Sequence, residues 1–126
     1  MVSGLATGST LVIYDGSPFY NHGSILWDLA ESENVTVFGV SAKYISAQEK
    51  AAIKPRSTHD LSSIKAILST GSPLAPESFD YVYNDIKRDI QLSSVSGGTD
   101  IISCFVSGNP VLPVIRGELQ CMGLGM

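Results

Sequence analysis

The sequence predicts one domain of the α/β class, with a mostly parallel sheet flanked by helices. Two observations support this prediction. The 126 residues suffice for one domain of ordinary size. Along them, short runs of β-branched and aromatic residues alternate with helical segments in the order β-α-β-α-β-α-β. Strands that are joined by helices pair in parallel, so we expect helices on both faces of the sheet.

The chain begins with the end of a helix, a strand and a second helix. Residues 1–6 are typical of the last turn of a helix that Gly8 caps. Residues 10–14, Thr-Leu-Val-Ile-Tyr, predict a buried strand, and a turn follows them. Apolar residues at helical spacing then predict a helix over residues 22–33, with Asn34 as its C-cap.

Two strands and a helix are predicted in the middle of the chain. Residues 35–40 predict a buried strand, because they are rich in β-branched and aromatic residues. A helix capped by Ser41 is expected to run to residue 53, and Pro55 prevents its extension. Residues 64–68 predict the third strand of the sheet.

The last part of the chain starts with the clearest amphipathic helix in the sequence. Pro76 suits its first turn, and four apolar residues follow at positions i, i+3, i+4 and i+7. These residues are Phe79, Val82, Tyr83 and Ile86. Further strands are expected at residues 92–95, at 101–106 and near 118–121.

Composition and charge exclude several classes of protein. Hydrophobic residues make up 44% of the chain, which excludes a disordered tail. The chain has 8 lysines and arginines against 12 acidic residues, for a net charge of −4. A general nucleic-acid binder needs the opposite sign, because the neutralisation of phosphates supplies its affinity. We therefore expect no nucleic-acid partner.

The cysteines and the apolar segments indicate a soluble protein of a reducing compartment. Cys104 and Cys121 have neither zinc-site nor disulfide-framework spacing. The N-terminus has no basic region of a secretory signal. No apolar stretch reaches the roughly 20 residues that span a bilayer. We expect a cytoplasmic protein without a membrane partner.

Two loops rich in glycine and hydroxyl side chains follow consecutive predicted strands. Gly71, Ser72 and Pro73 follow the third strand, where glycine lets the backbone approach a planar ligand and proline stiffens the turn. Residues 96–100, Ser-Gly-Gly-Thr-Asp, follow the fourth. Ligands of parallel sheets bind beyond the carboxyl ends of the strands, so we expect both loops side by side in one site. Plain tight turns are the alternative for both loops.

The second loop contains the side chains best suited to a nucleotide. Thr99 offers a hydroxyl donor to a phosphate oxygen, and Asp100 offers a hard oxygen ligand for Mg²⁺. Residues 7–10 are also rich in Gly, Ser and Thr, but they precede a predicted strand and lack the lysine of a phosphate loop. His22 and His59 lie apart in the sequence, and no third group completes a catalytic triad.

Four stretches of the chain together resemble the AMP-forming adenylate ligases, the family of the acyl-CoA synthetases. They are residues 8–18, 68–77, 96–101 and 116–121, and they follow one another in the family's order. The resemblance covers essentially the whole chain. It implies that residues 1–126 form part of the large AMP-binding domain of such a ligase.

The resemblance implies a two-step reaction with ATP, CoA and a carboxylic acid. The carboxylate attacks the α-phosphate of ATP to give acyl-AMP and pyrophosphate, and the thiol of CoA then displaces AMP. In this family the loop matching Gly71, Ser72 and Pro73 lies against adenine. The threonine matching Thr99 contacts the α-phosphate and so takes part in catalysis, and the acidic residue matching Asp100 helps to hold Mg²⁺.

The remaining residues of the second loop concern the binding of adenine and the choice of the acid. Ser96, Gly97 and Gly98 match the nucleotide-binding loop, but many relatives have an aromatic residue stacked on adenine where Ser96 stands. Acetyl-specific relatives have a tryptophan where Gly97 stands, which closes the acyl pocket. Gly97 therefore implies a longer acid such as acetoacetate, and another short- or medium-chain acid is the alternative. Asp100 replaces the glutamate that is commoner in the family.

Parts of the family's machinery are expected outside these 126 residues. The loop that grips the β- and γ-phosphates should precede Met1, and the mobile domain with the catalytic lysine should follow Met126. We therefore expect the chain alone to be inactive as a ligase. The alternative from another class is a non-enzymatic binding module or remnant. Exposed sheet edges would favour a homo-oligomer under either interpretation.

Overall fold

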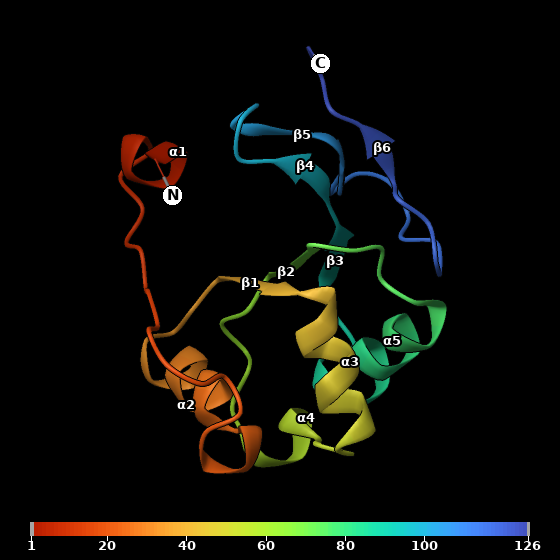
Figure 1. Ribbon diagram of the computed structural model, residues 1–126. Coiled ribbons are helices and arrows are strands. Elements are labelled where there is room, and N and C mark those ends of the chain that lie inside the picture. The colour runs from red at the N-terminus through yellow and green to blue at the C-terminus, as the bar shows by residue number, and fades with distance from the viewer. Residues whose placement is uncertain (1, 126) are drawn as a thin grey trace.

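The structure, a computed structural model, describes residues 2–125 as two small sheets, with most of the helices on one side of the parallel sheet (Figure 1). A parallel sheet consists of β1 (Val37–Ser41), β2 (Ala66–Thr70) and β3 (Gln91–Ser94), in that spatial order. An antiparallel sheet consists of β4 (Ser96–Gly98), β5 (Ser103–Ser107) and β6 (Cys121–Met122). The helices are α1 (Val2–Ala6), α2 (Ile25–Ser32), α3 (Ala42–Lys50), α4 (Pro55–Thr58) and α5 (Pro76–Tyr81), with a 3₁₀ turn at Asn21–Gly23 and a π-helical turn at Val82–Ile86.

The parallel sheet confirms the predicted α/β class, but its two faces differ. Phe38, Ile67 and Leu92 pair across the three strands and are buried in the core beneath the helices. On the opposite face, Val37 and Leu68 are 54% and 37% exposed. The prediction of helices on both faces is therefore wrong for residues 2–125, whose core lies on one face of this sheet.

Most element boundaries lie within two or three residues of the predicted ones. The C-cap of α2 is Glu33 and not the predicted Asn34, which follows it in the left-handed conformation that commonly ends helices, with φ +51°. Ser41 caps α3, because its Oγ accepts a hydrogen bond from the Tyr44 amide at 3.1 Å. The helix ends at Lys50, and Pro55 begins the separate helix α4. None of the described helices has both the length and the apolar character that a membrane span requires.

The N-terminal segment departs from the prediction at one point. α1 and Gly8, which has φ +75°, match the expected helix end, while Met1 lies outside the described residues. The strand predicted over residues 10–14 is wrong, because these residues adopt no regular structure and Ile13 is 69% exposed. A segment rich in β-branched residues becomes a strand only where another strand pairs with it. None of the described strands pairs with this one.

One buried polar side chain, Gln48 of α3, joins α2 and the 3₁₀ turn before it to its own helix. Its Oε1 accepts a hydrogen bond from Trp27 Nε1 at 3.1 Å, and its Nε2 donates to the Gly23 carbonyl at 3.0 Å. Trp27 also stacks on Phe38 of β1, with ring centroids 4.8 Å apart. Gln48 and Trp27 are almost completely buried, so water cannot replace either partner if the other is removed.

A side-chain hydrogen bond ties α2 to the residue that follows α4. His59 Nε2 lies 2.8 Å from Asp28 Oδ1, and Thr58 Oγ1 lies 2.7 Å from Nδ1 of the same ring. The hydrogen bond from His59, assisted by those from Ser24 and Asn21, holds the pKa of Asp28 below its ordinary value. Because the Asp28 side chain is 44% exposed, water screens the pair, which contributes at most about 1 kcal/mol.

Replacing Gln48 with methionine should lower the free energy of unfolding by about 2–4 kcal/mol, because the Trp27 N–H and the Gly23 carbonyl would stay buried without partners. Methionine keeps most of the side-chain volume, so little of the loss would come from packing. Urea unfolding followed by the fluorescence of Trp27, the single tryptophan, measures the change. The control Lys50→Met, on an exposed position of the same helix, should change stability by less than about 0.5 kcal/mol. Equal stabilities of Gln48→Met and the unmodified chain would contradict this role.

The Asp28 interaction should weaken the fold in acid. A carboxyl whose pKa is depressed in the folded state stabilises the fold above its unfolded pKa, about 3.9, and this contribution disappears as pH falls through the folded pKa. Asp28→Asn should therefore differ from the unmodified chain by up to about 1 kcal/mol near neutral pH and by much less near pH 2. Chemical unfolding at both pH values measures the difference. A difference that is the same at both would show that the charge of Asp28 contributes nothing.

Candidate functional site

The two loops singled out in the sequence follow the carboxyl ends of two neighbouring strands of the parallel sheet. β2 and β3 are parallel neighbours whose last paired residues are Ser69 and Ser94, and the Val95 amide donates to the Ser69 carbonyl at 2.7 Å. Residues 71–73, here called the β2–α5 loop, follow β2 directly, and β4 starts just after β3 (Figure 1). Both candidate segments thus start from neighbouring strand ends, although a helix and a strand separate them in the chain.

The β2–α5 loop is exposed in its middle and anchored at its end. Gly71 has φ +88°, a conformation that favours glycine, although an added Cβ would meet no atom within 4 Å. Ser72 and Pro73 are exposed, whereas Leu74 is only 4% exposed and lies in the core. Pro76 then begins α5. The exposed backbone of this loop can lie against a flat ligand.

Residues 96–100, expected as a loop, are partly a strand. The Ser-Gly-Gly triplet forms β4, which pairs antiparallel with β5 and has a bulge after its first residue. Thr99 and Asp100 lie in the turn of this β4–β5 hairpin (residues 96–107), where the Ile102 amide donates to the Thr99 carbonyl at 3.1 Å. The hairpin presents all five predicted site residues to solvent: Ser96, Gly97, Gly98, Thr99 and Asp100.

The two glycines of β4 are in different surroundings. A Cβ on Gly97 would overlap the Ser103 carbonyl oxygen and would lie 2.7 Å from Cys104 Cα, so no side chain fits there without moving β5. A Cβ on Gly98 would meet nothing within 4 Å. The family resemblance connects Gly97 with the size of the acyl pocket. The structure adds a second requirement for glycine, the close pairing of β4 with β5.

A loop near the C-terminus docks on the first turns of α5. Arg116 Nε donates to both carboxylate oxygens of Asp80, at 3.1 and 2.9 Å, and Arg116 Nη2 lies 3.8 Å from Glu77. Gly117 has φ +80°, and a Cβ there would approach Pro76 Cγ to 3.1 Å. These contacts therefore attach the C-terminal loop to α5, the helix that follows the β2–α5 loop. Nothing in the local sequence pairs Arg116 with Asp80, so sequence analysis missed this contact.

Gln120 fixes the C-terminal loops to the parallel sheet. Its Oε1 accepts hydrogen bonds from Gln91 Nε2 of β3 at 2.8 Å and from the Asn109 amide at 3.0 Å. Its Nε2 donates to the carbonyls of Leu112 and Pro113 at 2.9 and 3.0 Å. One side chain thus sets the position of the loop between β5 and β6 relative to β3. Sequence analysis missed this residue as well.

Asp100 fits only one kind of metal site. Residues 2–125 contain no group of three His, Cys, Asp or Glu side chains that could hold an ion by themselves. Mg²⁺ at nucleotide sites is typically held by one or two carboxylates together with phosphates and water. The exposed carboxylate of Asp100 at the tip of the hairpin fits an ion of that kind, which arrives with a nucleotide.

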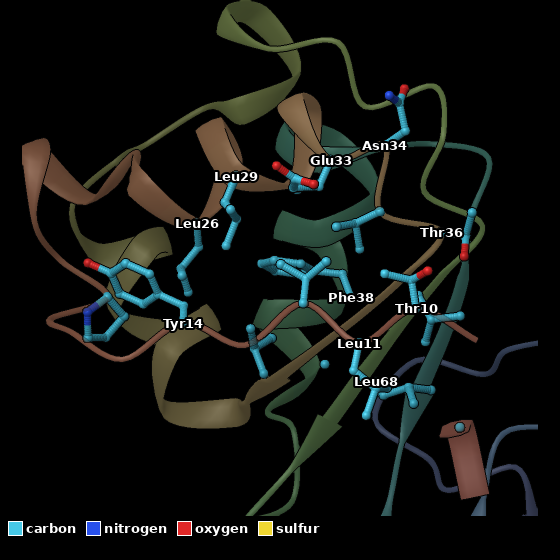
Figure 2. A pocket seen from close by; sticks show the side chains of 18 of the residues that line it. Thr10, Leu11, Tyr14, Leu26, Leu29, Glu33, Asn34, Thr36, Phe38 and Leu68 are labelled. Atoms are coloured by element: carbon cyan, nitrogen blue, oxygen red, sulfur yellow. The ribbon is translucent and has the colours of Figure 1, made fainter. Parts of the chain in front are cut away.

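A cleft of about 1160 Å³ lies away from both loops, along β1 (Figure 2). Its lining includes Leu11, Leu26, Phe38 and Leu68, and it includes none of the predicted site residues. Sequence analysis did not anticipate this cleft, because it expected residues 10–14 to be a paired strand.

The chain is similar over its whole length to part of several known proteins. It is 59% identical over 126 residues to acetoacetyl-coenzyme A synthetase of Rhizobium meliloti (strain 1021) and 51% identical to acetoacetyl-CoA synthetase of Mus musculus. It is 44% identical to malonamoyl-CoA synthetase vrtB of Penicillium aethiopicum. In each case the match covers 100% of this chain and 19% of the other protein. No family model matches the chain.

Two solved structures share its fold. Acetoacetyl-CoA synthetase from Streptomyces lividans matches with a TM-score of 0.89 and 46% identity, over 98% of this chain and 20% of that one. The anthranilate CoA ligase AuaEII, in complex with anthranoyl-AMP, matches with a TM-score of 0.73 over 87% of this chain and 20% of its own. At 21% identity, this second likeness shows the fold alone. The chain thus spans about a fifth of the length of the relatives that it matches.

Replacing Gly97 with alanine should destabilise the β4–β5 hairpin by about 1–3 kcal/mol, because the new methyl group would overlap backbone atoms of β5. Gly98→Ala is the matched control on the same strand, with open space around the methyl group, and should change stability by less than about 1 kcal/mol. Amide hydrogen exchange over residues 96–107 measures the local loss. Equal protection of the hairpin in both variants would refute the close contact at Gly97.

Proposed function

We propose that this chain, which is homologous over its whole length to one segment of the acetoacetyl-CoA synthetases, contributes the adenine and α-phosphate sites of an acid–CoA ligase. The proposed reaction has two steps. The carboxylate of the acid attacks the α-phosphorus of ATP and displaces pyrophosphate, which gives an acyl-adenylate. The thiol of CoA then attacks the acyl carbonyl and displaces AMP.

The observation that supports this function is that the two candidate segments follow the carboxyl ends of neighbouring strands. The β2–α5 loop and the β4–β5 hairpin leave neighbouring parallel strands at their carboxyl ends. In open α/β sheets this is the edge where nucleotides bind. We infer that adenine lies against Gly71, Ser72 and Pro73, which offer an exposed backbone without a bulky side chain.

The β4–β5 hairpin would hold the phosphate end of the nucleotide. In the proposal, the backbone of Ser96, Gly97 and Gly98 lines the path from the adenine to the α-phosphate. Thr99 donates its hydroxyl to an α-phosphate oxygen, where negative charge builds up during the attack of the carboxylate. Asp100 supplies one carboxylate to Mg²⁺, which neutralises phosphate charge when it is bound.

The acid that we propose is acetoacetate. Relatives named acetoacetyl-CoA synthetase are 59%, 51% and 46% identical to this chain, and Gly97 adds no side chain to the acyl side of the site. A related acid is the alternative, because a malonamoyl-CoA synthetase is 44% identical over the whole chain. Comparing acetoacetyl- and malonamoyl-adenylate analogues as ligands separates the two.

The proposed partners are small molecules: ATP, acetoacetate and CoA. A net charge of −4 argues against nucleic acid. Both cysteines, Cys104 and Cys121, are free, which agrees with the reducing cytoplasm that we propose as its location.

A second candidate function is a non-enzymatic module that associates with itself. It is favoured by the open face of the parallel sheet, where Val37 and Leu68 remain exposed. Such a module has no use for the hydroxyl of Thr99 or the carboxylate of Asp100. Ligand binding that depends on these side chains therefore separates the two functions.

Thr99→Ala should weaken the binding of AMP and of a stable acetoacetyl-adenylate analogue by roughly 10- to 100-fold, because a hydrogen bond to a charged phosphate contributes about 1.5–3 kcal/mol. Isothermal titration calorimetry with Mg²⁺ present measures both affinities. The control Thr58→Ala changes the same residue type on α4, away from the two loops, and should bind as the unmodified chain does. A folded chain that binds neither ligand, or that binds equally after Thr99→Ala, would refute the proposed role of the hairpin.

A further inference from the structure

Asp15 is the only aspartate or asparagine of the chain that precedes a glycine. Every other aspartate is followed by leucine, isoleucine or tyrosine. An aspartate before glycine can react with its own backbone, because the glycine has no Cβ that would keep its amide away from the aspartate carboxyl group. The reaction needs a backbone that can rotate and two reacting groups that have no other partner. The surroundings of Asp15 decide whether these conditions are met.

The backbone around Asp15 is not held by other parts of the fold. Between α1 and the 3₁₀ turn at Asn21–Gly23 the chain contains neither a helix nor a strand (Figure 1). Within the described chain, none of the main-chain N–H and C=O groups of residues 10–16 is hydrogen-bonded to another main-chain group. Segments whose backbone groups are bonded only to solvent move at little cost in free energy. The first condition is therefore met.

The two reacting groups have no other partner. Among residues 2–125, the Asp15 carboxylate forms no hydrogen bond or ion pair, and the Gly16 N–H donates to no acceptor. By contrast, the carboxylate of Asp28 is held by His59, and that of Asp80 by Arg116. Asp15 and Gly16 are also exposed, so water reaches both. The second condition is met as well.

Tyr14 gives a structural reason for glycine at position 16. The Tyr14 hydroxyl donates to the Ser17 carbonyl at 3.2 Å, so its ring bends back over the residues between them. A Cβ on Gly16 would lie 2.7 Å from the Tyr14 hydroxyl oxygen and 2.8 Å from the ring carbon that carries it. Any other residue would have to displace this ring. The contact that favours glycine therefore also maintains the reactive pair.

We propose that Asp15 and Gly16 form a site of spontaneous isoaspartate formation. The Gly16 amide nitrogen bonds to the Asp15 Cγ, and one carboxylate oxygen leaves as water with the amide proton and a proton from solvent. The product is a cyclic imide without the negative charge of Asp15. Water then breaks one of the two C–N bonds of the imide. Breaking the bond to Cγ restores aspartate, whereas breaking the bond to the main-chain carbonyl carbon leaves isoaspartate.

Isoaspartate alters the path of the main chain, which then runs through Cβ and Cγ of residue 15 and is longer by one methylene group. Tyr14 and Gly16 line the cleft along β1, so this wall of the cleft changes with the linkage. The released α-carboxylate is the group that an isoaspartyl methyltransferase esterifies with the methyl group of S-adenosylmethionine. An enzyme of this class is the partner that the site would take. No nucleotide or acid substrate takes part, so the reaction is independent of the proposed function.

Incubation of the folded 126-residue chain near neutral pH tests the proposal. At intervals the chain is unfolded and digested with a protease that cleaves before aspartate but not before isoaspartate, and mass spectrometry measures the uncleaved peptide. Isoaspartate should form at Asp15 no more than about 10-fold more slowly than in a free peptide of residues 9–21, because the fold does not hold this segment. Asp100 is the internal reference, since it is also exposed but precedes the β-branched Ile101. It should react more slowly than Asp15.

Two substitutions at Asp15 identify the reaction. Asp15→Glu keeps the charge but would need a six-membered imide, so an isoaspartyl methyltransferase should transfer far fewer methyl groups to this variant after incubation. Asp15→Asn forms the same imide with ammonia as the leaving group and should accept methyl groups sooner than the unmodified chain. Both variants should fold, because position 15 is exposed and its side chain has no partner among the described residues.

Three results would overturn the proposal. A rate at Asp15 more than about 10-fold below that of the free peptide would show that the fold protects the pair. A rate no higher than that of Asp100 would show that Gly16 confers no reactivity. Equal methylation of Asp15→Glu and the unmodified chain would place the isoaspartate elsewhere in the chain.

Discussion

The in-register pairing of β2 with β3 is the constraint on which the candidate site depends. Ile67 pairs with Leu92 and Ser69 pairs with Ser94, so the two strands end at the same level. The segments that follow them therefore start next to each other. Ile67 and Leu92 are each 1% exposed. A shift by one residue would turn these side chains to the open face, so burial in the core holds the register. Because of this packing, the β2–α5 loop and the β4–β5 hairpin start next to each other.

A second set of contacts attaches the β4–β5 hairpin to β3. Gly108 lies so close to β3 that a Cβ would overlap the Ser93 hydroxyl, and Gln120 bonds both to Gln91 and to the loop after β5. The antiparallel sheet is therefore attached to β3 through its own loops and not only through the chain at Val95. This attachment holds the base of the hairpin against β3, whereas its turn, residues 99–102, is exposed to solvent.

The sequence predicts the parallel half of the fold because its signals are local. Buried strands are rich in β-branched residues, and helix ends are marked by caps and prolines, so most boundaries are close. The resemblance to AMP-forming acyl-CoA synthetases, recognised from the loops, is confirmed by the comparisons. Residues 10–14 show the limit of such signals. A strand also needs a neighbouring strand to pair with, and the residues of the strand itself do not indicate whether one is present. The contacts of Arg116 with Asp80 and of Gln120 with Gln91 join distant residues and leave no pattern in the sequence.

The contact between Gly97 and β5 restricts which residues position 97 can carry. A larger side chain at position 97 cannot be accommodated by one substitution, because backbone atoms of Ser103 and Cys104 fill the space. The pairing of the hairpin, including its bulge after Ser96, would have to change at the same time. A single substitution at position 97 therefore weakens the hairpin unless β5 shifts with it.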